Sequence, residues 1–106
     1  IRDYKVTGVQ KCALPISVAP NEPEAIYDIG TILLNEQRFA AAAARFEMAL
    51  TIRPEWAEAH NNLGIALANQ NKLSEALTHF ERAVALKPSL QDAQANRDQA
   101  RAALRR

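Results

Sequence analysis

Hydrophobic residues recur at helical spacing from Pro23 onward. In the first stretch, up to about Glu36, they lie three or four positions apart, which is typical of a helix with one buried face. The residues of this face are Ala25, Ile26, Ile29, Ile32 and Leu33. A second helical pattern begins at Phe39 and ends before Pro54, because proline disfavours the helical conformation in the preceding residue. Its predicted buried stripe is Phe39, Ala42, Ala43, Phe46, Ala49, Leu50 and Ile52.

The same pair of patterns returns 34 residues later, from Ala57 to Pro88. Ten residues are identical between the two blocks at this offset, and they include Gly30 and Gly64, which interrupt the apolar face of their helices. Because glycine costs about 1 kcal/mol relative to alanine inside a helix, its return predicts a close approach of the partner helix. Each block is therefore a helical hairpin, which cannot bury its apolar face alone and must stack on a neighbour.

A third copy begins after Pro88 but is incomplete. Arg97 and Asp98 stand where the buried leucine and the glycine of the second block stand, and no second helix follows. We expect residues 91–106 to form a solvating helix with a polar outer face. The stripe of Arg97, Arg101 and Arg105 is spaced by four residues, which favours a solvated helix face, with an anionic partner as the alternative.

The amino-terminal segment has a different character from the repeats. Residues 1–16 resemble a translated sequencing adaptor, because from Val6 onward they match VTGVQTCALPI except for Lys11. We interpret them as a non-native coil, with a natural strand as the alternative. Val18 and Pro20 are in register with Ile52 and Pro54, so residues 17–22 are expected to be the end of a truncated upstream repeat.

Charge and composition exclude several classes of function. The chain of 106 residues has a formal net charge of +1, but residues 1–16 hold three of its 13 basic and one of its 12 acidic residues. The remainder has a net charge of −1, which does not suit a nucleic-acid-binding protein. No apolar run approaches the roughly 18 residues of a membrane helix. The single cysteine, Cys12, excludes an internal disulfide.

No constellation of catalytic or metal-binding residues is recognisable. His60 and His79 are nineteen residues apart on different predicted helices, with no carboxylate at ligand spacing. We interpret His60 as a packing residue. No Ser/His/Asp or Cys/His set can be assembled, and Gly30 and Gly64 are helix positions rather than a phosphate-binding loop. We therefore expect no enzyme, no cofactor and no metal.

The repeat resembles the tetratricopeptide repeat, whose pattern is W-x2-L-G-x2-Y, then A-x3-F, then P. The second block matches with His60, Leu63-Gly64, Leu67, Ala76, Phe80 and Pro88. The first block matches with Ile26, Ile29-Gly30, Leu33, Ala42, Phe46 and Pro54. The resemblance implies an all-α fold with two repeats, residues 23–56 and 57–90, followed by the capping helix 91–106.

The resemblance also implies a binding surface, because in such proteins the first helix of each hairpin lines the inner, concave face. The inward positions with candidate binding roles are Tyr27, Asp28, Thr31, Asn35, Glu58, Asn61, Asn62, Ile65, Asn69, Asn96 and Gln99. Asparagine offers a donor and an acceptor, so this amide-rich row could hold the backbone of an extended peptide. Relatives attached to protein O-glycosyltransferases bind in this way through asparagines at the positions of Asn62 and Asn96. The alternative is that asparagine before Leu-Gly is frequent in the family for structural reasons.

The resemblance and the charges together narrow the expected partner. Relatives that clamp the terminal carboxylate of a chaperone have lysine where this chain has Tyr27 and Asn61, so that clamp is disfavoured. The inward acidic residues would prefer a neutral or basic segment; they are Glu24, Asp28, Glu58 and Asp92. We expect a scaffold that binds a protein or peptide partner, without nucleic acid or membrane. The alternatives are an accessory tail of a larger enzyme, such as a glycosyltransferase, and a segment that only extends and caps a superhelix.

Overall fold

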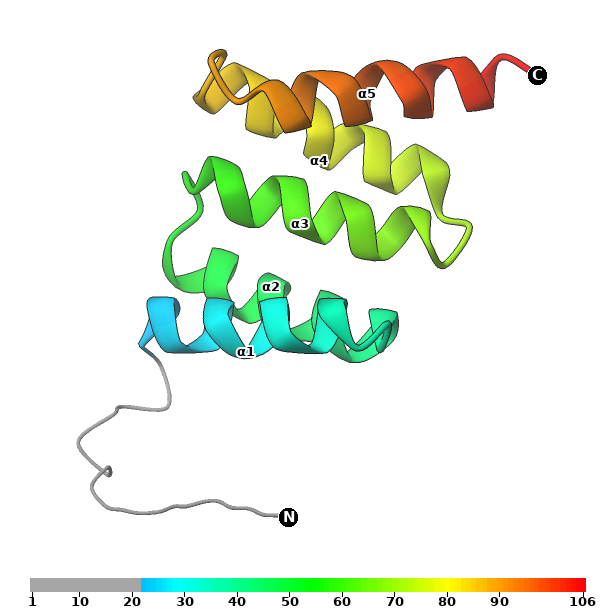
Figure 1. Ribbon diagram of the computed structural model, residues 1–106. Helices are drawn as coiled ribbons and strands as arrows, with labels where there is room; N and C mark the ends of the chain where they lie inside the picture. The colour runs from blue at the N-terminus through cyan, green and yellow to red at the C-terminus, as the bar shows by residue number, and fades with distance from the viewer. Residues whose placement is uncertain (1–21) are drawn as a thin grey trace.

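The computed structural model describes residues 22–106, which form five α-helices in one continuous stack (Figure 1). The helices are α1 (Pro23–Asn35), α2 (Phe39–Ile52), α3 (Ala57–Ala68), α4 (Leu73–Leu86) and α5 (Gln91–Leu104). Each packs against the next in the chain, and α3 also contacts α1 and α5. The predicted all-α architecture of two hairpins and a final helix is confirmed. The adaptor-like segment and residues 17–21 lie outside the described residues.

The helix ends follow from local sequence. Pro23 occupies the first turn of α1, where its missing N–H leaves no bond unmade, and Glu24 places a negative charge at the positive end of the helix dipole. The turns after α1 and α3 are the same Schellman motif, with Gln37 and Asn71 at positive φ of 62° and 64°. The next residue in each turn donates its backbone N–H back into the helix, Arg38 to Leu33 and Lys72 to Leu67, both at 2.9 Å. The predicted end of the first helix near Glu36 is confirmed.

The two helix glycines mark the close approach that the sequence predicts. A Cβ atom added at Gly64 would lie 2.5 Å from Cε1 of Phe80, and one added at Gly30 would lie 2.8 Å from Cε1 of Phe46. Both rings are almost fully buried, at 0% exposed for Phe46 and 3% for Phe80. Each phenylalanine of a second helix therefore fills the space that the glycine of its first helix leaves open.

Three residues that we predicted to be buried in the hairpins are exposed instead. Ile29 and Ile32 on α1 are 42% and 57% exposed, and Ile52 on α2 is 43% exposed. The apolar pattern of α1 is correct, but within residues 22–106 α1 contacts only α2 and α3, and these contacts leave Ile29 and Ile32 exposed. Leu104 of α5 is also 44% exposed.

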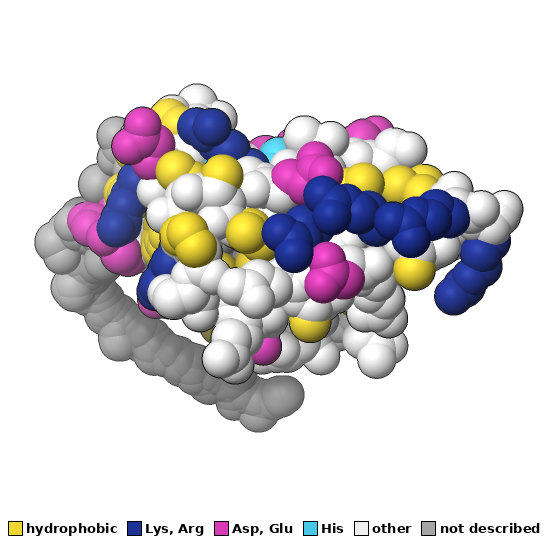
Figure 2. Space-filling view, turned by 90° about the horizontal axis from the view of Figure 1, so that it is seen from above, with side chains coloured by type: hydrophobic (Ala, Val, Ile, Leu, Met, Phe, Trp, Pro, Cys, Tyr) yellow, Lys and Arg dark blue, Asp and Glu magenta, His cyan; other side chains and the backbone are white. Residues whose placement is uncertain are grey.

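The last helix presents a polar outer face. Ala93 and Ala100 are its buried residues, whereas arginines line the side away from the stack (Figure 2). Arg101 contacts Glu81 on α4 at 3.2 Å, and Arg97 contacts Asp98 at 3.0 Å. No helix in the described part of the chain is both long enough and apolar enough to cross a membrane.

Candidate interaction surface

The first helices α1, α3 and α5 lie side by side and carry the candidate residues except Asn69, which directly follows α3 (Figure 1). Four of these residues are exposed: Asp28, Asn35, Asn69 and Gln99. Six are half-buried: Tyr27, Thr31, Glu58, Asn62, Ile65 and Asn96. The remaining one, Asn61, is only 6% exposed. The structure therefore brings the predicted residues onto one surface, but Asn61 is poorly placed to contact a ligand.

Two hydrogen bonds join neighbouring first helices in the same register. Asn62 donates from Nδ2 to the hydroxyl of Tyr27 at 2.9 Å, and Asn96 donates from Nδ2 to Oδ1 of Asn61 at 3.0 Å. In each pair the donor lies 35 residues after the acceptor. Amides that we predicted to bind a ligand thus also tie one repeat to the next, which agrees with the structural alternative. The side-chain oxygen atoms of Asn62 and Asn96, Oδ1 in each, take no part in these two bonds.

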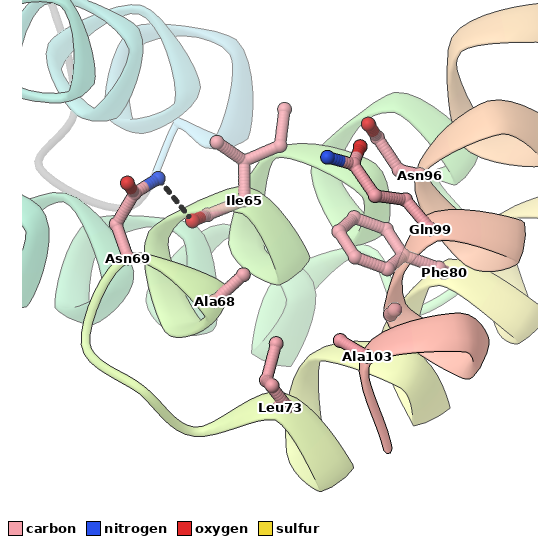
Figure 3. Close-up of a pocket in the computed structure, with 9 residues that line it drawn as sticks. Ile65, Ala68, Asn69, Leu73, Phe80, Asn96, Gln99 and Ala103 are labelled. Carbon is pink, nitrogen blue, oxygen red and sulfur yellow. Dashed lines mark hydrogen bonds between the residues drawn. The ribbon is translucent and has the colours of Figure 1, made fainter. Parts of the chain in front are cut away.

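A pocket of about 280 Å³ opens between α3, α4 and α5 (Figure 3). Three amide side chains line it, Asn69, Asn96 and Gln99, and Asn69 donates to the backbone carbonyl of Ile65 at 2.9 Å. The apolar part of its lining is Ile65, Ala68, Leu73, Phe80, Ala100 and Ala103. The lining contains no charged side chain. Four of the predicted residues belong to this pocket, whereas Leu73 and Phe80 stand 34 residues after Phe39 and Phe46 of the predicted buried stripe.

An aromatic stack lies at the other end of the surface. The rings of Tyr27 and Trp56 stack with centroids 4.5 Å apart, and the guanidinium of Arg53 lies 4.3 Å from the centroid of the Trp56 ring. Burial, followed by the charge of Glu58, raises the pKa of Tyr27, so its hydroxyl stays protonated at neutral pH. Sequence reasoning missed Trp56, which precedes α3 directly. The sequence did contain an indication, because the first repeat has this large aromatic residue at the position where the second repeat has Leu90.

Two of the acidic residues that we expected to attract a partner are paired within their own hairpins. Glu24 contacts Arg53 and Glu58 contacts Lys87, both at 2.8 Å and both across 29 residues. The hydrogen bond from Lys87 is the largest cause of the lowered pKa of Glu58. The electrostatic argument for a basic partner then rests mainly on Asp28 and Asp92.

The two histidines, which sequence spacing gave no reason to pair, are in direct contact. Nδ1 of His60 lies 3.0 Å from Nδ1 of His79, and Nε2 of His60 lies 2.9 Å from the carbonyl oxygen of Pro54. Because a carbonyl only accepts, neutral His60 carries its proton on Nε2, and His79 donates from Nδ1 to Nδ1 of His60. Burial lowers the pKa of both imidazoles. This contact joins α3, α4 and the turn between α2 and α3.

Metal coordination finds no support among the described side chains. Within residues 22–106, no group of three or more His, Cys, Asp or Glu residues lies where it could hold a metal ion. Both ring nitrogens of His60 and Nδ1 of His79 are engaged in the hydrogen bonds above, which is the arrangement of a packed polar contact.

Solved structures of several proteins are similar to this chain in fold. The first tetratricopeptide domain of Spaghetti (RPAP3), bound to the HSP90 peptide SRMEEVD, superposes with a TM-score of 0.81 and 22% identity over 86% of this chain and 72% of that one. The TPR2B domain of yeast Sti1 in complex with pHsp70 superposes with a TM-score of 0.75 and 21% identity over 77% of this chain and 66% of that one. MamA superposes with a TM-score of 0.74 and 20% identity over 80% of this chain and 50% of that one.

The chain therefore spans only part of the length of these proteins, from half of MamA to about seven-tenths of the Spaghetti domain. No curated protein matches the chain by sequence. The family model of the tetratricopeptide repeat matches residues 27–90, which is more than half of the chain. With the repeated hairpins and the glycine–phenylalanine contacts, this match shows that the chain belongs to the tetratricopeptide repeat family.

Proposed function

We propose that this chain is a protein-interaction module that holds an extended peptide along the surface formed by α1, α3 and α5. The observation that carries the proposal is the pocket between α3, α4 and α5, because it combines an apolar lining with three amides and lies on the predicted surface. Two structures of similar fold, from Spaghetti and yeast Sti1, are complexes with an HSP90 peptide and with pHsp70. Their existence supports a peptide ligand for this fold.

The lining of the pocket defines the side chain that it would accept. Phe80, Leu73 and Ala103 offer apolar contacts, and a charged side chain would find no counter-ion in the lining. A neutral, apolar side chain of the peptide is therefore favoured at this position. The amides of Asn69, Asn96 and Gln99 would pair with the backbone of the peptide on either side of it.

The test is capture of peptides from a random library, followed by affinity measurement with two variants. Gln99→Ala removes an exposed pocket amide, and a lost hydrogen bond of about 0.5–1.5 kcal/mol predicts a roughly 2- to 10-fold weaker affinity. The matched control is Gln91→Ala, on the same helix but outside the pocket. Ala103→Phe fills the pocket and should weaken binding further without removing any polar group.

The outcomes separate the proposal from its alternatives. Binding that is unchanged in both Gln99→Ala and Ala103→Phe would place the peptide elsewhere and refute the pocket as its site. A folded chain that captures no peptide at all would instead favour a segment that only extends and caps a superhelix. Melting curves of both variants show whether any loss of binding comes from unfolding.

A further inference from the structure

Three arginines stand in a row on α5, on a side that the proposed peptide site does not use. They are Arg97, Arg101 and Arg105, which follow one another at intervals of four residues and which we call the arginine row. Four residues advance an α-helix by about 6 Å, so the three guanidinium groups lie along one side of the helix. Figure 2, which looks down on α5, shows a band of basic side chains across this end of the molecule. The lining of the pocket, by contrast, contains no charged side chain.

The side of α5 that carries the row corresponds to a side of α3 that receives a helix. Phe80 of α4 packs against Gly64 there, and the neighbouring Leu63 and Leu67 are buried. In the 34-residue register, α5 has arginine in place of both leucines and Asp98 in place of the glycine. Within residues 22–106, α5 packs only against α3 and α4. The position for a helix is therefore open on α5, but charge replaces its apolar lining and a carboxylate occupies the space that a phenylalanine ring would need.

The arginine row is only partly neutralised within the described chain. Arg97 contacts Asp98 at 3.0 Å. Arg101 contacts Glu81 at 3.2 Å, with about half of each side chain exposed. Arg105 is exposed, and no carboxylate of residues 22–106 pairs with it. Because exposed ion pairs are weak, Arg97 and Arg101 can exchange their carboxylates for those of a partner.

We propose that the arginine row docks an acidic helix of a partner protein, at a surface separate from the peptide site. A helix with an acidic residue at every fourth position presents its carboxylates about 6 Å apart, which matches the spacing of the row. Arginine suits this contact, because its planar guanidinium pairs with both oxygens of a carboxylate, whereas lysine offers a single point charge. The contact is made through long side chains at the surface, so the charges stay partly hydrated and the cost of burying them is small.

An acidic helix fits the row better than a nucleic acid does. The row is only about 12 Å long, and the carboxylates of Glu81 and Asp98 border it. A helix can turn neutral side chains toward these two carboxylates, since its own charges lie on one face. A nucleic acid carries phosphates all along its backbone and would be repelled by them. Residues 17–106 also have a net charge of −1, which does not favour a polyanion over their whole surface.

The test titrates the isotopically labelled full chain with a blocked peptide of alanine and glutamine that has glutamate at every fourth position. A length of about 20 residues lets the peptide populate a helix in isolation. Changes in the NMR shifts of backbone amides should concentrate on α5, and raising the ionic strength to about 1 M should weaken binding through screening. Arg105→Gln should weaken the affinity roughly 1.5- to 5-fold. Arg45→Gln, at an exposed position of α2, is the matched control and should leave the affinity unchanged.

Four results would overturn the proposal. The first is an absence of shift changes on α5 at a peptide concentration of about 1 mM, which would exclude even weak docking. The second is equal binding of a peptide with glutamine in place of every glutamate, because the contact would then not depend on charge. The third is an affinity that Arg105→Gln and Arg45→Gln change equally. The fourth is a DNA duplex that shifts the α5 amides at lower concentration than the acidic peptide, which would assign the row to a nucleic acid.

Discussion

Replacing Gly64 by alanine would place a methyl group 2.5 Å from Cε1, 2.7 Å from Cδ1 and 2.9 Å from Cζ of Phe80. Carbon atoms pack favourably at about 3.5–4.0 Å, so the ring must move by roughly 1 Å. Phe80 is 3% exposed and belongs to the central core, which leaves the ring little room to move. The substitution therefore acts as overpacking of a buried helix–helix contact.

Two opposing terms set the size of the effect. Overpacking costs about 1–3 kcal/mol, while replacing a helical glycine by alanine gains about 1 kcal/mol. The net expectation for Gly64→Ala is a loss of about 1 kcal/mol, equivalent to a melting temperature lower by about 4–8 °C for a domain of this size. At Gly30 the nearest contact, to Phe46, is 2.8 Å, so the two terms should nearly cancel in Gly30→Ala.

The assay is thermal and urea unfolding followed by circular dichroism. Ala44→Gly, at an exposed position of α2, measures the helix-propensity term in the same fold and should cost about 1 kcal/mol. If Gly64→Ala stabilises the chain by as much as Ala44→Gly destabilises it, the ring imposes no steric limit and the reasoning is wrong. A larger loss at Gly30 than at Gly64 would contradict the ordering taken from the distances.

Three further predictions concern single contacts. Burial lowers the pKa of His60 and His79, so the unfolded chain binds more protons than the folded chain below about pH 6.5. The free energy of unfolding should therefore be constant above that pH and fall below it. A melting temperature that does not change between pH 7.5 and 5.5 would exclude this linkage. Glu58→Gln should cost less than about 1 kcal/mol in urea unfolding, because its ion pair is exposed; a loss above 2 kcal/mol would mean that the pair is part of the core. Phe46→Ala should cost about 3–5 kcal/mol of stability and remove most of the helical circular dichroism signal at 25 °C. Met48→Ala, at an exposed position of the same helix, should change stability by about 0.5 kcal/mol at most. Equal effects of the two substitutions would refute the burial of Phe46.

Much of the fold could be predicted from local sequence. Helix starts, helix stops and the 34-residue period depend on residues close together in the chain, such as Pro23 in the first turn of α1 and Pro54 after α2. The glycine–phenylalanine contact was also predictable in kind, because a glycine inside a helix needs a packing reason. Its partner, Phe80 for Gly64, became definite only in the structure.

The candidate surface was predicted in outline and revised in detail. The family resemblance placed the candidate residues on the first helices, where the structure has them. Contacts between helices were not predictable: Asn61 is 6% exposed and accepts a hydrogen bond from Asn96, and Asn62 donates one to Tyr27. The pocket needs side chains from three helices at once, and periodicity on one helix cannot indicate such a combination.

The sequence by itself determined which face of each helix is apolar, because a period of 3.6 residues requires only local information. Only the tertiary structure decided what covers that face: Leu63 and Ala66 are buried on α3, which has helices packed before and after it, while Ile29 and Ile32 stay exposed in the same register. It also decided that His60 meets His79. Burial is a property of two packed surfaces, and the second surface is contributed by residues far away in the chain.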